Sequence, residues 1–223
     1  MTGNTAQDAA HDAGTGSGTR SGTEPGTRAA TEPGTRSGTE SGGLRVFLAA
    51  PFVQFIDADD GVVGPLWRAR LSSLRDALMD AGHAVFNAHH NEGWGEWGLP
   101  PQECVPSDFR ALQCADLVLA YPGTPASTGV ALELGWASAM RKPVALLLDP
   151  GTSYSPMISA LGEVSPVLPL DFDGSWSKEA VTAAVSAALG WAGALGARPG
   201  PWGAADLDTA LAYHRRTQEA AAS

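Results

Sequence analysis

Residues 127 to 133 place a serine, a glycine and a glutamate where a helix is expected to begin. The segment Ala115–Trp136 starts as a short apolar run, continues through Pro, Gly, Thr and Ser, and resumes with helical spacing, which predicts strand, loop and helix. Ser127 stands at the expected N-cap, and the backbone N–H groups after it, including that of Gly129, attract anions, phosphate above all. Glu133 lies about 6 Å further along the axis, and its side chain leans back toward the same end. A phosphate site beside a carboxylate suggests an enzyme that acts on the ribose of a nucleotide.

The same residues also have a purely structural interpretation. Any helix needs an N-cap, and the helix macrodipole alone favours a glutamate in the first turn. The position of the loop supports a functional role, because ligands of open α/β sheets gather beyond the carboxyl ends of strands.

Three other segments are expected to reach the same crevice. The loop after the first strand carries Phe52 and Gln54, the loop after the second carries Trp94 and Trp97, and the helix before the third carries Asp108. Flat aromatic rings suit a nucleobase, so the two indoles either cover a base or tuck against the core. Asp108 would join the glutamate as a pair of carboxylates, and such pairs break glycosidic bonds.

The histidines and cysteines do not have the spacing of a metal site. His89 and His90 are adjacent and therefore point in different directions, and no third ligand follows at metal spacing. Cys104 and Cys114 are separated by roughly 15 Å if one helix carries both, which is beyond the reach of a disulfide. We therefore expect neither a metal ion nor another cofactor.

Charge and hydropathy exclude several classes of partner. The 223 residues carry a formal net charge of −10, opposite in sign to the basic surface that binds nucleic-acid polymers. No apolar run approaches the roughly 18 residues of a membrane span, and the polar start lacks a signal-peptide core. A cytoplasmic protein that binds a small nucleotide or nucleoside, and no membrane, is the expectation.

Composition divides the chain into three parts. Residues 1–42 repeat Gly, Ser and Thr with almost no large apolar side chain, which predicts a disordered tail. Residues 43–196 alternate short apolar runs with helical patterns, which predicts a three-layer α/β/α sandwich with a five-stranded, mainly parallel sheet, flavodoxin-like or Rossmann-like. Residues 197–223 are expected to be a C-terminal extension with a helix. Within the domain, residues 89–98 are expected to form a loop, and the following helix to begin at Pro106 or Ser107.

Other enzyme templates are missing from the sequence. The residues Ala49-Ala50-Pro51-Phe52 follow the first strand in place of a Gly-x-Gly-x-x-Gly fingerprint. Neither a Walker-type Gly-Lys-Ser/Thr nor a Gly-x-Ser-x-Gly elbow occurs. The carboxylate pair is what remains to carry chemistry.

Several motifs together resemble the nucleoside 2-deoxyribosyltransferase superfamily. They are Phe47-Leu48-Ala49-Ala50-Pro51-Phe52, Asp108 with Leu112, Ala115-Asp116, Ser127-x-Gly129-x-x-x-Glu133-Leu134-Gly135, and Lys142-Pro143. The likeness covers residues 44 to 172. Within the superfamily the sequence is most similar to the nucleoside 5'-monophosphate N-glycosidases of nucleoside-antibiotic pathways, which act on CMP and hydroxymethyl-CMP. The stretch with Asn87, His89, Glu92 and Trp94 also resembles that subgroup.

The resemblance implies a role for each matching residue. Glu133 is similar to the nucleophile that attacks C1' and forms a glycosyl-enzyme, and Asp108 to the acid that helps the base leave. Ser127 and the Gly129 N–H match the seat of the 5'-phosphate. Ser155 matches a serine that reaches the phosphate of the neighbouring subunit's site, which implies a homodimer.

Two positions depart from the family pattern. Phe47 stands where the hydrolases of deoxyribonucleotides often have Tyr, and the missing hydroxyl leaves room for a 2'-hydroxyl, which favours a ribonucleotide. Val53 stands where the N-glycosidases usually have Arg, so one charge-assisted substrate contact, typically worth about 1.5 to 3 kcal/mol, is missing. The sequence thus predicts hydrolysis of a CMP-like pyrimidine ribonucleotide to base and ribose 5-phosphate. The alternatives are a nucleoside (deoxy)ribosyltransferase and a non-catalytic nucleotide sensor.

Overall fold

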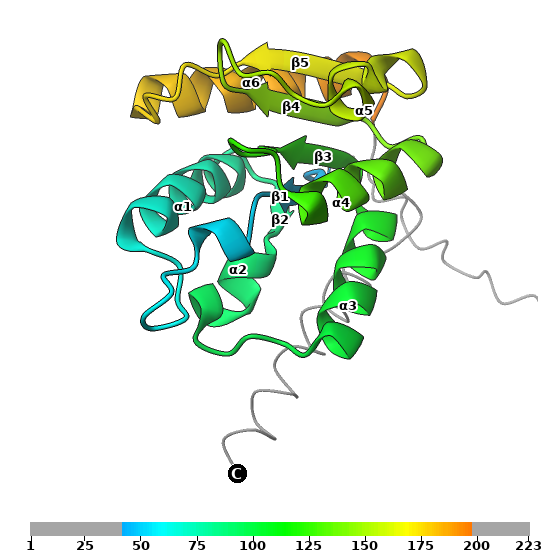
Figure 1. Cartoon of the computed structure of the whole chain (residues 1–223). Helices are drawn as coiled ribbons and strands as arrows, with labels where there is room; N and C mark the ends of the chain where they lie inside the picture. The colour runs from blue at the N-terminus through cyan, green and yellow to red at the C-terminus, as the bar shows by residue number, and fades with distance from the viewer. Residues whose placement is uncertain (1–41, 198–223) are drawn as a thin grey trace, which may run out of the picture. The chain divides into compact units, whose positions relative to one another are not determined.

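Short apolar runs of the sequence become the strands of one parallel sheet in the computed structural model, which describes residues 42–197 (Figure 1). The strands are β1 Arg45–Ala49, β2 Ala84–Phe86, β3 Leu117–Ala120, β4 Val144–Leu148 and β5 Val167–Asp171. Their order is β2-β1-β3-β4-β5, and every pairing is parallel. The predicted terminal segments lie outside the described residues, apart from residues 42 and 197 at their borders.

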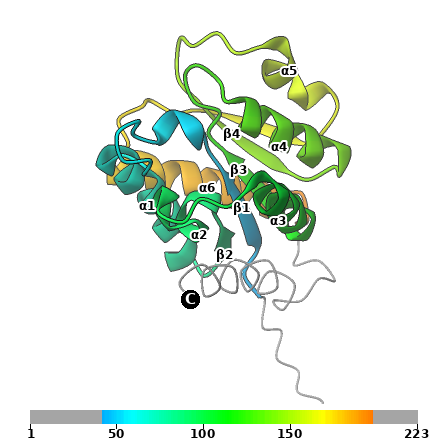
Figure 2. The ribbon, with the colours of Figure 1, turned by 60° about the horizontal axis from the view of Figure 1, so that its bottom comes forward.

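Helices cover both faces of the sheet. They are α1 Pro65–Asp80, α2 Ala88–Asn91, α3 Pro101–Cys114, α4 Thr128–Ala139, α5 Pro156–Ser159 and α6 Lys178–Ala194. Helices α1 and α6 pack together on one face, while α3 and α4 pack together on the other (Figure 2). The predicted three-layer α/β/α architecture is confirmed. None of the helices within residues 42–197 is both long and apolar enough to cross a membrane.

Alternate residues of each strand supply two separate cores. In β1, Val46 and Leu48 point into the core under α1 and α6, whereas Phe47 and Ala49 point into the core under α3 and α4. Burial on both faces explains why the strands read as continuous apolar runs rather than alternating ones. The two cores fix β1 and β3 between helices, which makes the ends of these strands a rigid base for a site.

Two boundaries differ from the sequence prediction. The segment expected to be a loop over 89–98 begins with α2, because the Asn87 side chain accepts a hydrogen bond from the His90 N–H (3.2 Å) and caps a short helix. Helix α3 begins at Pro101 rather than at Pro106 or Ser107. Pro101 is at the favoured first position, where a missing N–H costs no hydrogen bond, whereas Pro106 lies inside the helix and removes the N–H that would bond to the carbonyl of Gln102.

The strand order creates one switch point, between β1 and β3. From β1 the chain crosses first to β2 on one side and then returns to β3 on the other. The connections therefore diverge at the carboxyl ends of β1 and β3, which is where open α/β sheets hold their ligands.

Candidate active site

A cavity of about 590 Å³ lies at the carboxyl ends of β1 and β3. Its volume is in the usual range of about 300 to 1,000 Å³ for a small-molecule site. Most of the residues expected from the sequence to bind substrate line it together: Phe47, Phe52, Gln54, His89, Asp108, Ser127, Gly129 and Glu133. Segments far apart in the chain thus meet at the switch point of the sheet.

Two carboxyl groups in this cavity lack a hydrogen-bond partner among the described residues. Oε2 of Glu133 and Oδ1 of Asp108 are both shielded from solvent and unpaired. Burial, followed by the charge of Glu92, raises the pKa of Asp108 to about 7. Burial and the charge of Asp108 raise the pKa of Glu133 well above its usual value. Interacting acids of this kind titrate as a pair, so that one can be protonated while the other is charged, which leaves an acid and a base in the same cavity.

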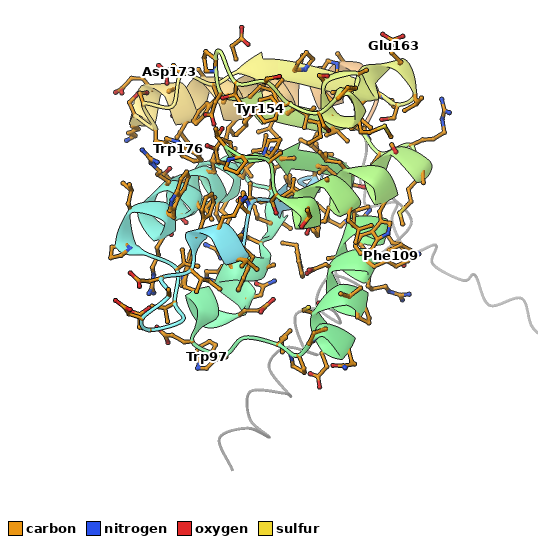
Figure 3. All side chains as sticks on the ribbon, viewed as in Figure 1. Trp97, Phe109, Tyr154, Glu163, Asp173 and Trp176 are labelled. Carbon is orange, nitrogen blue, oxygen red and sulfur yellow. The ribbon has the colours of Figure 1, made fainter. Side chains whose placement is uncertain are left out.

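Helix packing brings the two acids together. Glu133 is on the second turn of α4, about 7.5 Å along the axis from its first residue, and Asp108 is on the second half of α3. The ring of Phe109, labelled in Figure 3, meets the indole of Trp136 edge-on, with centroids 5.2 Å apart. This contact joins the residue after Asp108 to the helix that carries Glu133, so aromatic packing sets the relative position of the acids.

The amino end of α4 forms another wall of the cavity. Ser127 occupies the N-cap with an extended backbone, and its side chain makes no capping hydrogen bond. The first N–H groups of the helix, including that of Gly129, have no intrahelical acceptor. Hydroxyl, amides and helix dipole are therefore directed at one end of the cavity, where they suit an anion.

The loop before α4 is held from both sides. Gln54 donates from Nε2 to the carbonyl of Pro125 (3.1 Å), which ties the loop after β1 to the loop after β3. On the far side, the hydroxyls of Tyr121 and Thr124 both donate to Oδ2 of Asp149, at 2.8 and 2.6 Å. These bonds fix the backbone amides before a ligand arrives.

His89 serves as a neutral hydrogen-bond donor. Its Nε2 lies 2.9 Å from the carbonyl oxygen of Pro51, which accepts only, so the ring carries its proton on Nε2. Burial lowers the pKa of His89 to about 4. Asn87 donates from Nδ2 to the carbonyl of Leu48 (3.2 Å) and does not line the cavity. Both side chains hold the backbone at the end of β1 rather than offering a charge.

Besides Asn87, three residues expected near the substrate lie outside the cavity. Trp94 is 6% exposed and packs into the core with the guanidinium of Arg68 over its ring (5.4 Å), so it does not line the cavity. Trp97 is half exposed at the loop between α2 and α3 (Figure 3). Ser155 is exposed at the amino end of α5 and also lies outside the cavity. Its expected contact with a neighbouring subunit stays a prediction.

Other residues line the cavity without having been given a role by the sequence. Glu92, Leu99 and Cys104 form part of its wall, next to Asp108. Glu92 was noted only as part of the stretch that resembles the N-glycosidase subgroup, and no role followed, because the segment was expected to be a loop and its orientation toward Asp108 could not be predicted. Within the described part of the chain, no cluster of His, Cys, Asp and Glu side chains could hold a metal ion.

The solved structures that are similar to this chain include two with about 30% sequence identity. The CMP N-glycosidase BcmB of Clostridium botulinum is 29% identical over 64% of this chain and 98% of that one, with a TM-score of 0.50. BlsM is 31% identical over 74% of this chain and 100% of that one, with a TM-score of 0.61. No protein-family model and no curated protein sequence matches the chain. Because the likeness to BlsM spans that whole protein and the fold agrees, the chain belongs to the nucleoside 2-deoxyribosyltransferase-like family, as its motifs predicted.

Proposed function

We propose that the protein hydrolyses the N-glycosidic bond of a CMP-like pyrimidine ribonucleoside 5'-monophosphate to free base and ribose 5-phosphate. At the level of the family, the chain is a glycosidase-like enzyme. The observation that carries the proposal is a pair of carboxyl groups, each with one solvent-shielded and unpaired oxygen, that line one cavity with the amino end of a helix. A buried acid without a partner destabilises the fold, so its retention indicates a role toward a ligand.

In the first step, a carboxylate oxygen of Glu133 attacks C1' of the ribose. The C1'–N bond to the base breaks, the carboxyl group of Asp108 gives its proton to the departing base, and a glycosyl ester forms. A pKa of about 7 leaves about half of Asp108 protonated at pH 7 and most of it below that pH, as this role requires.

In the second step, water attacks C1' and breaks the ester. Asp108, now a carboxylate, accepts the proton of the water, and Glu133 leaves as a carboxylate, so the configuration at C1' is retained. The product is ribose 5-phosphate, and both acids return to their starting protonation states.

The amino end of α4 supports the phosphate part of the proposal. The Ser127 hydroxyl and the amides of Thr128 and Gly129 would bind the 5'-phosphate. Phe47 is 1% exposed, stacks on Phe86 with centroids 5.4 Å apart, and lines the cavity. Its ring carries no hydroxyl to occupy the space of a ribose 2'-hydroxyl.

The test is a panel of CMP, UMP, dCMP and cytidine, with free base and ribose 5-phosphate measured as products. We expect base release from the ribonucleotides and none from protein with Glu133→Gln. Glu163→Gln, which changes an exposed acid away from the cavity, is the matched control and should retain full rate. Mass spectrometry after rapid acid quench should find ribose 5-phosphate attached to the peptide that contains Glu133.

A second base added to the reaction separates hydrolysis from transfer. Formation of a new nucleotide in place of ribose 5-phosphate would establish a transferase that uses the same residues. Tight binding of CMP without any product would contradict both reactions and leave a sensor.

A further inference from the structure

Glu92 is the third carboxyl group of the cavity, and the proposed reaction does not use it. The residue is 5% exposed yet belongs to the cavity wall. Its Oε2 accepts a hydrogen bond from the Leu99 N–H (3.0 Å). No other hydrogen bond to this carboxyl group occurs among the described residues. One oxygen is therefore held by the backbone, while Oε1 has no protein partner in that part of the chain.

The backbone around Glu92 fixes the direction of its side chain. Gly93 and Trp94 both have positive φ, at 59° and 63°, and reverse the chain directly after Glu92. A Cβ on Gly93 would lie 2.5 Å from the ring of Trp97, so only glycine fits there. The Trp97 N–H returns to the carbonyl of Glu92 (3.2 Å). The carboxyl group thus projects from a closed turn and is oriented before a ligand binds.

The position of Glu92 relative to the acids identifies the part of the substrate it would meet. Glu92 and Cys104 line the cavity beside Asp108, and the charge of Glu92 acts on both of these groups. Asp108 must reach the base to protonate it, whereas the α4 amides would hold the phosphate. The wall that carries Glu92 is therefore on the base side of C1'.

A carboxylate at the base side selects for hydrogen-bond donors. Cytosine presents its exocyclic 4-amino group, and Asp or Glu carboxylates accept from that group in protein–nucleic acid contacts. Uracil presents a carbonyl oxygen at the same place, which would meet Oε1 as a second acceptor. Burial raises the pKa of Glu92, while the Leu99 N–H opposes the shift because it stabilises the charged form.

We propose that Glu92 is the residue that selects the base: Oε1 accepts a hydrogen bond from an exocyclic amino group, so the protein takes amino-substituted bases in preference to their oxo counterparts. The proposal rests on the proposed function, because that function places the base next to Asp108. It adds a specificity-determining residue outside the carboxylate pair.

Glu92→Gln separates this role from a merely structural one. The amide oxygen of Gln can accept from the Leu99 N–H as the carboxylate does, which turns the amide NH₂ toward the cavity. The wild-type protein should have a kcat/KM for CMP at least about tenfold above that for UMP. In the variant, the ratio of kcat/KM for CMP to kcat/KM for UMP should fall at least about tenfold, which shifts the preference toward UMP. Glu96→Gln, four residues further in the same loop and exposed, is the matched control and should keep the wild-type ratio.

An unchanged CMP/UMP ratio in folded Glu92→Gln overturns the proposal. If the variant does not fold, the wild-type protein decides with a nucleotide whose base is pyrimidin-2-one, which lacks the amino group and adds no bulk. Its dissociation constant should be at least about tenfold weaker than that of CMP, and equal binding overturns the role of Glu92.

Failure of the proposed function gives a different pattern. If wild-type protein releases no base from any nucleotide, calorimetric binding of CMP and UMP still reports the preference. A CMP preference that Glu92→Gln removes supports the inference for a binding site, and absence of a preference, or of binding, rejects it.

Discussion

The two ends of the sheet bury carboxyl groups in opposite ways. At the amino ends of the strands, the Asp116 carboxylate accepts three hydrogen bonds from Arg45. Two come from the guanidinium, at 2.9 and 2.7 Å, and the third comes from the backbone N–H of Arg45. The Arg45 side chain is 6% exposed and that of Asp116 is 5% exposed. At the carboxyl ends, Asp108 and Glu133 have shielded oxygens with no partner in the described residues. A paired buried charge secures the fold, whereas an unpaired one is kept at a cost to stability for a ligand to use.

Substitution of the unpaired glutamate should give the largest effect, and only on activity. Glu133→Gln removes the proposed nucleophile, so base release should fall at least roughly 10⁴-fold. The midpoint of thermal unfolding should stay constant or rise, because a shielded and unpartnered carboxyl group is replaced by a neutral amide. Parallel kinetics and calorimetry measure both quantities. A variant that loses activity and stability together would mean that Glu133 supports the fold.

The paired aspartate should show the opposite behaviour. Asp116→Asn leaves a buried guanidinium without its carboxylate and should lower the free energy of unfolding by about 3 to 5 kcal/mol. The kcat of the folded fraction should stay near wild type, because Asp116 does not line the cavity. Denaturant titration gives the stability. In the matched double variant, Arg45→Met with Asp116→Leu, much of the loss should be recovered, and a loss as large as in the single variant would contradict the comparison.

The sequence predicted the architecture well because apolar runs report burial directly. Five such runs and the N-cap expected at Ser127 sufficed to predict the layers and the position of the cavity. The carboxylate pair was visible from spacing and family motifs. Glu92 belonged to a stretch that resembles the family, but its place in the cavity was not visible, since its orientation depends on a three-residue turn with positive φ that composition does not specify. Trp94 was ambiguous for the same reason: an indole in a Gly-rich loop packs into the core or covers a ligand, and only the path of the turn decides.

The unpaired acids should also make stability depend on pH. The pKa values of Asp108 and Glu133 are raised in the folded protein, so folding takes up protons. The stability that these two acids contribute is complete below about pH 4 and is lost as the pH rises toward 7. His83, His89 and His90, whose pKa values are lowered chiefly by desolvation, act with the opposite sign. The Asp108→Asn, Glu133→Gln double variant keeps those histidines. The free energy of unfolding of this double variant minus that of wild type should increase by about 1 to 3 kcal/mol as the pH rises from 4.5 to 7.5. Denaturant titrations across that range test this, and a constant difference would contradict the pKa shifts.

Packing rather than charge pairing positions the unpaired acids, and this should give the smallest of the effects. Phe109→Leu removes the edge-on contact with Trp136 that joins α3 to α4, at a cost of about 0.5 to 1.5 kcal/mol in stability. Because Asp108 and Glu133 lie on those two helices, kcat should fall by roughly three- to tenfold as they lose alignment. Phe172→Leu is the control: it removes an edge-on contact with Trp176 in the other core, so it should lower stability and leave kcat unchanged. If both variants lower kcat in proportion to their loss of stability, the effect is general loosening, and the acids are not aligned by this contact.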